Sequence, residues 1–232
     1  MRLRRAIRGG GEGTEVMMRR VLRGLGWTFI GMGCFVLYFL VYQLVGTNAT
    51  ASQEQSSLRK ELESTWTARA GIPAGRSDAA KPRSIPVGKG IALLQIPRIK
   101  VEQVVVQGVE RADLKKGPGH VPSTVMPGQA GTFGVSGHRT TYGGPFFRLN
   151  ELTKGDIMTV VTKDSVFTYQ VTSKKLVLPS DVSVLDNVRG PGGKVEPTIT
   201  LTTCHPRFSA KQRLIVFGNL VATVPNNGTV AA

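Results

Sequence analysis

The sequence PTITLTTCHPRFSAKQRLIVFGNLVATV, residues 197–224, contains two runs of β-branched and apolar residues separated by a polar loop. The first run ends at Cys204 and the second begins near Arg213, so HPRFSAKQ forms the connection between them. If the two runs pair as antiparallel strands, their backbones lie about 4.8 Å apart. The side chains of Cys204 and Arg213 then reach one site at the paired ends of the strands.

Six further runs of the same kind lie between Gly90 and this pair, separated by Gly, Pro and Asp. They are IALLQI, VEQVVVQ, GTFGVS, DIMTVVT, SVFTYQV and KKLVLP. Eight short strands at this spacing predict an all-β sandwich or barrel. The turn residues TKDS at 162–165 lie between two of the runs and predict a hairpin. GVERADLKKGPGH and PFFRLNEL each predict a single helical turn between strands.

An uncharged, mostly apolar segment from Leu25 to Val45 precedes the β-rich part of the chain. Its length matches the roughly 20 residues that a helix needs to cross a bilayer. A cleaved signal peptide is the alternative, because Ala49-Thr50-Ala51 resembles a processing site, but such a peptide has an apolar region of only about 7–15 residues. We therefore expect an uncleaved transmembrane anchor at 25–45.

Charge on either side of this segment predicts its orientation. Seven arginines precede it, against two glutamates, so the positive-inside rule predicts a basic cytoplasmic tail at 1–24 and an extracytoplasmic remainder. The tail also accounts for a large share of the net charge of +15. The other Lys and Arg residues are scattered without interleaved aromatic residues, so nucleic acid is not an expected partner. An anionic wall or lipid surface fits better.

Residues 46–90 are polar, rich in small residues and contain three prolines towards their end. This composition predicts an extracytoplasmic linker or stalk. Within it, a short helix is expected from Ser57 to Arg69, because Leu58, Leu62 and Trp66 recur at four-residue spacing.

Only two cysteines occur in the chain, and Cys34 lies within the expected membrane segment. Cys204 is therefore alone in the extracytoplasmic part and has no intramolecular disulfide available. A lone cysteine in an oxidising compartment is either buried and inert or a thiol retained for reactivity. Because a free thiol is mostly protonated at neutral pH, a catalytic cysteine needs a partner, which is usually histidine.

Three histidines are candidates for that partner. His205 follows Cys204 directly, but successive side chains of a strand point to opposite faces, so His205 is expected to turn away. His120 lies in the Gly/Pro-rich segment GPGHVPS, where a surface or loop-bracing role is simpler. His138, at the end of an apolar run, is the best base or acid candidate. Arg213 is suited to holding a substrate carbonyl or stabilising an oxyanion.

The sequence TLTTC at 200–204, followed nine residues later by Arg213 and preceded 66 residues upstream by the histidine of SGH, resembles the sortases. These are membrane-anchored cysteine transpeptidases of Gram-positive cell surfaces. The resemblance covers roughly residues 90–224. It implies the eight-stranded sortase β-barrel with short helices, a catalytic domain at 91–224 and a C-terminal tail at 225–232.

The resemblance also implies the site and its reaction. His138, Cys204 and Arg213 take the three catalytic roles, and Thr203 contacts the substrate. Cys204 attacks the Thr–Gly bond of a sorting signal on a secreted protein and forms a thioester, while His138 protonates the leaving amine. An amine, typically of a peptidoglycan precursor, then resolves the thioester. No cofactor or metal is implied, and the sequence has no carboxylate cluster of the kind that a calcium site needs.

Within the sortases, GHRTTYGGPFFRLNEL at 137–152 is most similar to class E, the housekeeping type of actinobacteria. This class favours an LAxTG-like signal over LPxTG. Tyr142 in this segment is the candidate for the residue that shapes the substrate pocket.

Two other functions stay open. A cysteine L,D-transpeptidase of the wall also acts through a thioester, but its motif resembles Ser-His-Gly-Cys-x-Arg, whereas here the histidine follows the cysteine and the glycine is missing. The second is a catalytically inactive, membrane-tethered barrel that serves as a binding module. A pure binder has no need of the complete Cys–His–Arg set, so a sortase is the expected function.

Overall fold

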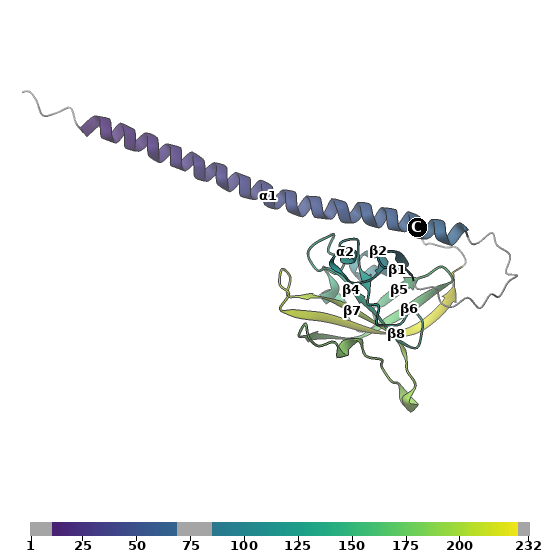
Figure 1. The fold of residues 1–232 in the computed structure, drawn as a ribbon. Helices are drawn as coiled ribbons and strands as arrows, with labels where there is room; N and C mark the ends of the chain where they lie inside the picture. The colour runs from purple at the N-terminus through teal and green to yellow at the C-terminus, as the bar shows by residue number, and fades with distance from the viewer. Residues whose placement is uncertain (1–10, 69–84, 227–232) are drawn as a thin grey trace, which may run out of the picture. The chain divides into compact units, whose positions relative to one another are not determined.

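The computed structural model describes residues 11–68 and 85–226, which Figure 1 shows as a ribbon. The chain divides into two compact units, residues 1–46 and 47–232. Part of the predicted segments lies outside the described residues, namely the first ten residues of the cytoplasmic tail, residues 69–84 of the linker and residues 227–232 of the C-terminal tail.

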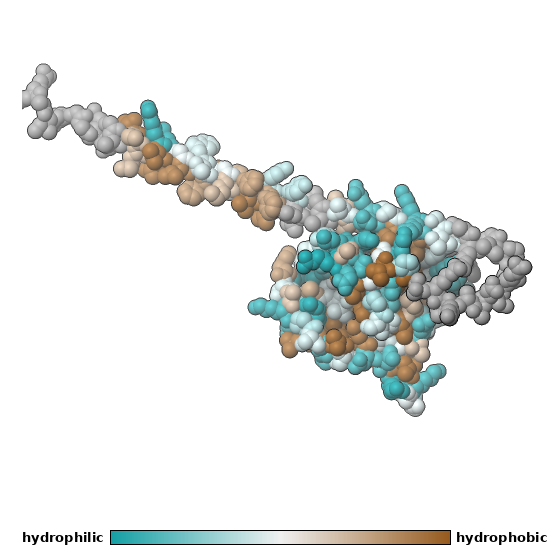
Figure 2. All heavy atoms as spheres, in the orientation of Figure 1, coloured by the Kyte–Doolittle hydropathy of each residue, from teal (hydrophilic) through white to brown (hydrophobic). Residues whose placement is uncertain are grey.

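The first unit consists of the N-terminal part of helix α1, which runs from Gly11 to Ala68. Residues Val16–Tyr42 are long and apolar enough to cross a membrane, and no other helix among the described residues is. Figure 2 shows apolar side chains along this part of α1. A transmembrane helix was expected at 25–45, and the apolar stretch Val16–Tyr42 overlaps it and agrees with a membrane anchor.

The second unit is built around a closed barrel of eight strands in the order β1-β2-β3-β4-β7-β8-β6-β5. Pairing of β1 with β5 closes the barrel, so no strand is left at an open edge. Two neighbouring pairs, β2–β3 and β4–β7, are parallel, and the other pairs are antiparallel. The strands are β1 (Gly90–Ile96), β2 (Val101–Gln107), β3 (Gly119–His120), β4 (Gly131–Ser136), β5 (Ile157–Val161), β6 (Ser165–Val177), β7 (Pro197–His205) and β8 (Gln212–Pro225).

Short helical turns connect the strands. They are α2 (Arg111–Leu114) and the 3-10 turns η1 (Pro97–Ile99), η2 (Leu149–Glu151), η3 (Ser183–Leu185) and η4 (Pro191–Gly193). Helical turns predicted in GVERADLKKGPGH and PFFRLNEL are thus present as α2 and η2. The predicted hairpin at 162–165 is also confirmed, because β5 and β6 pair antiparallel on either side of it.

Eight strands were predicted, but two of the predicted runs form one strand. SVFTYQV and KKLVLP are joined in β6, which pairs along β8 from Ser165 to Val177 with two register shifts. The missing strand is β3, which has only two residues and lies where we expected a loop. A strand this short shows no alternating pattern. It is held by its neighbours, because Gly119 pairs with Val106 on one side and with Ser136 on the other.

The C-terminal part of α1 belongs to the second unit and packs on the barrel. Leu58 and Leu62 are buried in a cluster with apolar residues of β1, β2 and β5, and Trp66 packs against it. The side chain of Gln55 accepts a hydrogen bond from the backbone N–H of Val104 and donates to the carbonyl of Lys116, at 2.8 and 2.7 Å. The apolar stripe that predicted a helix here is therefore the face that covers these strands.

Candidate active site

Cys204 and Arg213 are brought together by the hairpin of β7 and β8. The two residues are register partners in the antiparallel pair, next to the loop that connects the strands. This confirms the pairing that the sequence predicted. Cys204 is a half-buried free thiol. Alternation along β7 places it on the opposite face from Leu201 and Ile199, which lie in the core of the barrel.

His138 reaches the same end of the barrel through β4, the other neighbour of β7. The two strands are parallel and in constant register from Gly131↔Pro197 to Ser136↔Thr202. One step further on, the backbone N–H of Gly137 still donates to the carbonyl of Thr202 at 3.0 Å. The same register carries His138 alongside Cys204. The predicted histidine, cysteine and arginine therefore lie on three adjacent chain segments, with the cysteine in the middle.

The ring of His138 lies against the ring of Tyr142, with 5.1 Å between centroids and 39° between planes. Its Nε2 atom is buried and has no hydrogen-bond partner among the described residues. Burial lowers the pKa of His138 below its ordinary value. The imidazole is therefore biased towards its neutral form, with one ring nitrogen free for proton transfer.

Arg213 is half-buried and anchored by its own loop. Its Nη1 donates to the carbonyls of Ala210 and Gln212 at 3.0 and 3.2 Å. A guanidinium has five N–H donors, and both of these bonds within the described part of the chain use Nη1. The remaining donors are available to an oxygen on a bound molecule.

The other two histidines are held in structural contacts. His120 is 2% exposed. Its Nδ1 lies 2.8 Å from Oε1 of Gln107 and its Nε2 lies 3.1 Å from Oγ1 of Thr124, which matches a bracing role and not a surface position. Nδ1 of His205 lies 3.3 Å from Nη1 of Arg139. Both ring nitrogens of His120 and Nδ1 of His205 thus have polar neighbours, whereas Nε2 of His138 has none among the described residues.

Thr203 is buried, and its hydroxyl donates to the carbonyl of Gly137 at 2.8 Å. It occupies the face of β7 opposite to Cys204. The bond fixes the backbone just before His138, and the predicted contact between Thr203 and substrate stays a prediction.

Tyr142 lies in a sharply turned loop directly after His138. Its own φ is 51°, and Gly143 and Gly144 follow with φ of 76° and 50°. These left-handed conformations are readily adopted by glycine and seldom by tyrosine. The backbone N–H of Gly143 donates to Oδ1 of Asn48 at 3.0 Å, so the barrel-side part of α1 holds the loop.

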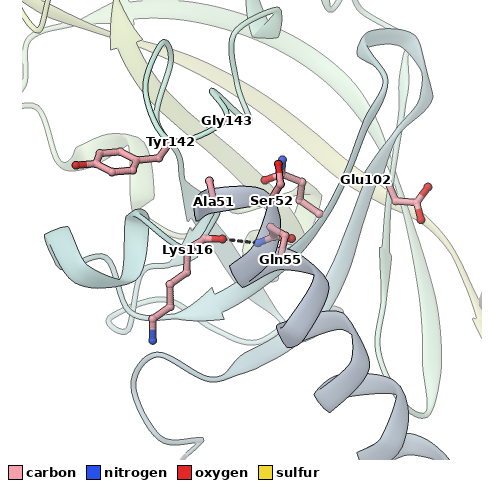
Figure 3. A pocket seen from close by; sticks show the side chains of 8 residues that line it. Ala51, Ser52, Gln55, Glu102, Lys116, Tyr142 and Gly143 are labelled. Carbon is pink, nitrogen blue, oxygen red and sulfur yellow. Dashed lines mark hydrogen bonds between the residues drawn. The ribbon is translucent and has the colours of Figure 1, made fainter. Parts of the chain in front are cut away.

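A cavity of about 210 Å³ lies between this loop, α1 and β2 (Figure 3). Its lining is polar on several sides. Within this lining, Gln55 donates a hydrogen bond to the carbonyl of Lys116. The lining residues are Ala51, Ser52, Gln55, Glu102, Gln103, Lys116, Tyr142 and Gly143.

Sequence reasoning missed Arg139, the residue directly after His138. It is 4% exposed, and its guanidinium donates to the carbonyl of Cys204 at 3.2 Å and to Oδ1 of Asn150 at 2.8 Å. An arginine in a glycine-rich loop is ordinarily solvated. The available signal was its position beside His138 at the end of a strand, where alternation turns neighbouring side chains in opposite directions.

A thiol, an imidazole with a free ring nitrogen and a guanidinium, gathered on three adjacent segments, are the groups that cysteine-dependent acyl transfer uses. The sequence matches the sortase domain over residues 94–221. The chain belongs to the sortase family of cysteine transpeptidases.

Individual relatives place it near class E. The chain is 37% identical over 215 residues to sortase SrtE1 of Streptomyces coelicolor, a match that covers 88% of this chain and 58% of the relative. The chain thus spans little more than half the length of that protein. It is 30% identical over 200 residues to sortase D of Bacillus subtilis, covering 83% of this chain and 95% of the relative.

Solved structures agree. Sortase E of Streptomyces avermitilis superposes with a TM-score of 0.57 at 36% identity, covering 63% of this chain and 97% of that chain. Sortase E1 of Streptomyces coelicolor with a tripeptide in the active site has a TM-score of 0.57 at 37% identity, covering 62% and 95%. The similarity to class E that residues 137–152 indicated is therefore confirmed.

Proposed function

We propose that this sortase cleaves the Thr–Gly bond of an LAxTG-like sorting signal through a thioester on Cys204 and transfers the acyl group to an amine. The observation that supports this most strongly is the placement of His138, Cys204 and Arg213 at one end of three adjacent segments, through the registers of β4, β7 and β8. Similarity to class E sortases supports the choice of signal.

The proposed reaction has two steps. Cys204 Sγ attacks the threonine carbonyl carbon and gives its proton to the free nitrogen of His138. The C–N bond to glycine then breaks as His138 passes that proton to the leaving amine. In the second step, an incoming amine attacks the thioester carbon and gives a proton to His138, the C–S bond breaks, and His138 returns the proton to Sγ of Cys204. Free N–H groups of Arg213 stabilise the oxyanion in both steps.

Two further residues are proposed to define where the peptide lies. Tyr142 borders the cavity beside α1 and its ring lies tilted against the ring of His138, so it joins substrate recognition to the proton-transfer group. The hydroxyl of Thr203 donates a hydrogen bond to the carbonyl of Gly137 and so fixes the backbone just before His138.

We also propose the orientation of the chain and its acceptor. The apolar part of α1 anchors the chain, and the arginines that precede it remain in the cytoplasm. The barrel is then extracytoplasmic, where an amine of a peptidoglycan precursor is the acceptor. Labelling of single cysteines introduced at each end of the apolar helix, in intact cells and with an impermeant reagent, tests this orientation.

A single peptide assay tests the function. Full-length protein in detergent micelles is incubated with LAxTG and LPxTG peptides, with and without an amine acceptor, and products are identified by mass spectrometry. We expect preferential cleavage of LAxTG after threonine and an acceptor-dependent transfer product. The variants Cys204→Ala and His138→Ala should abolish both, whereas His205→Ala should retain much of the activity. Cleavage by Cys204→Ala at the wild-type rate would refute the assignment.

A further inference from the structure

Arg139 is a buried cation that has only neutral partners. Its Nε donates to the carbonyl of Phe147 at 3.2 Å and its Nη2 donates to Oδ1 of Asn150 at 2.8 Å. Its Nη1 donates to the carbonyl of Cys204 at 3.2 Å and lies 3.3 Å from Nδ1 of His205. Within the described residues it forms no ion pair with a carboxylate.

Burying such a charge is unfavourable unless its hydrogen bonds are satisfied. Burial lowers the pKa of Arg139, the nearby charge of Arg207 lowers it further, and the attraction of Cys204 opposes both. A neutral side chain of the same length would avoid this desolvation. The position therefore calls for what a guanidinium supplies, which is several donors held in one plane.

The bond to Cys204 replaces a missing bond of the sheet. In the β4–β7 pair, the N–H of Gly137 donates to the carbonyl of Thr202. Carbonyls two residues apart on a strand point to the same side, so the carbonyl of Cys204 also faces β4. Strand β4 has ended by then, at Ser136. The side chain of Arg139 supplies the donor at the position where the backbone ladder stops.

The guanidinium of Arg139 also reaches the turn η2 and the residues just before it. Phe147 lies before η2 and Asn150 lies within it. The guanidinium of Arg207, from the β7–β8 loop, packs 4.0 Å from the ring centroid of Phe147. Arg139 therefore ties the end of β7 to the segment after His138 and to η2. The end of β7, the segment after His138 and η2 are therefore all in contact with the side chain of Arg139.

We propose that Arg139 is a positioning residue, which fixes the backbone of Cys204 and thereby aims its thiol at the carbonyl carbon attacked in the first step. Arg139 does not touch the substrate and acts only through Cys204. The inference rests on the proposed function in one respect, that Cys204 is the nucleophile.

The test compares three variants with a matched control in the full-length protein. Arg139→Lys keeps the charge but not the fork of donors, and Arg139→Gln keeps one amide donor and loses the charge. Asn150→Ala removes one anchor of the guanidinium at an exposed residue, so that the fold is retained. Arg148→Gln is the control, because Arg148 lies in the same segment and bonds to Glu151 instead.

Peptide cleavage is measured as kcat and KM per folded molecule, with folding followed by circular dichroism. A displacement of the thiol by about 1 Å lowers kcat by roughly 100-fold, so we expect a loss of that order for Arg139→Gln with little change in KM. Arg139→Lys should lose less, Asn150→Ala should lose least, and Arg148→Gln should match the wild type. A merely structural arginine would lower the amount of folded protein and leave kcat per folded molecule unchanged.

A second readout is independent of activity. The chain has two cysteines, so carbonyl-13C cysteine gives two backbone signals, and the variant Cys34→Ser assigns them. We expect the Cys204 carbonyl signal to move in the Arg139 variants and in Asn150→Ala, but not in Arg148→Gln. An unmoved signal, or wild-type kcat in folded Arg139→Gln and Asn150→Ala, would refute the positioning role alone. Absence of Cys204-dependent cleavage in the wild type would instead refute the proposed function.

Discussion

Cys204 and Arg213 face each other as register partners across the antiparallel strands β7 and β8. The backbone hydrogen bonds between the two strands set the separation of the pair. No contact between the two side chains is needed to hold them there. Arg213 is in addition anchored through Nη1 by carbonyls of its own loop. The guanidinium is thus preorganised, which is the property that makes a donor effective towards a developing oxyanion.

Replacing Arg213 should therefore affect kcat more than KM. We expect Arg213→Lys to lower kcat for an LAxTG peptide by roughly 100-fold, because an ammonium cannot keep two loop bonds and still present a planar pair of donors. Steady-state cleavage assays give both constants. Lys211→Ala, at an exposed residue of the same loop, is the control. Wild-type kcat in Arg213→Lys would exclude a role for the fork geometry.

The activity of the enzyme should fall on the acid side of its pH profile with a midpoint below the ordinary histidine pKa of about 6.5. This part of the profile is its acid limb. Burial lowers the pKa of His138, so the imidazole stays neutral, and able to accept the thiol proton, as pH falls past that value. Activity is lost only when pH falls through the lowered pKa. Values of kcat/KM measured from about pH 4.5 to 8 locate this limb.

Removing the ring that covers His138 should move that limb. In Tyr142→Ala the imidazole is more hydrated, so its pKa rises towards the ordinary value and the acid limb moves to higher pH. Phe147→Ala, in the same segment but not against His138, should leave the limb in place. An acid limb that is the same in wild type and Tyr142→Ala would contradict the assignment of the limb to His138.

Gly137 has no room for a side chain. A Cβ atom at this residue would lie 2.7 Å from Cδ2 of Phe146, whose side chain is fully buried. We expect Gly137→Ala to lower the free energy of unfolding by about 1–3 kcal/mol and to reduce kcat, because the displaced backbone carries His138. Urea unfolding and peptide cleavage measure the two effects. The double variant with Phe146→Leu should recover part of the kcat loss, and no recovery would argue against a steric cause.

Packing of α1 on the barrel should contribute to stability. Leu62 is 7% exposed. Leu62→Ala should therefore lower the free energy of unfolding by about 2–3 kcal/mol, near the lower end for buried leucines because the site is at the edge of its cluster. Urea unfolding of the full-length protein, followed by tryptophan fluorescence, measures the change. Lys60→Ala, on the exposed face of the same helix, should cost almost nothing, and equal effects for the two would show that this face of α1 is not buried in solution.

The hairpin that bears Cys204 and Arg213 was predictable because its determinants are local. Alternation along one strand, a polar loop and a second strand are contiguous in the sequence, and they place both residues without knowledge of the rest of the fold. His138 was identified as a candidate from its local setting and from the resemblance to sortases. Its partner strand could not be identified in this way, because the parallel β4–β7 pairing joins segments 66 residues apart.

Four features escaped sequence reasoning for different physical reasons. β3 has only two residues and is too short to show an alternating pattern. β6 continues through two register shifts in its pairing with β8, and the sequence around the second shift was interpreted as a break between two strands. The stripe Leu58, Leu62 and Trp66 predicted a helix with an apolar face but could not say which surface covers that face. Arg139 was overlooked because its burial depends on acceptors from three separate segments, none of which its own neighbourhood reveals.

The parallel pairing of β4 with β7 also determines when the site can exist. β7 and β8 are neighbours in the chain, so the loop between Cys204 and Arg213 closes at little entropic cost, whereas His138 reaches the thiol only after a loop of 66 residues has closed. A partly folded chain can thus hold its cysteine and arginine side by side and still lack the histidine. Under the proposed mechanism, the thiol has its proton acceptor only after β4 has paired with β7, so a chain that lacks this pairing would not transfer an acyl group.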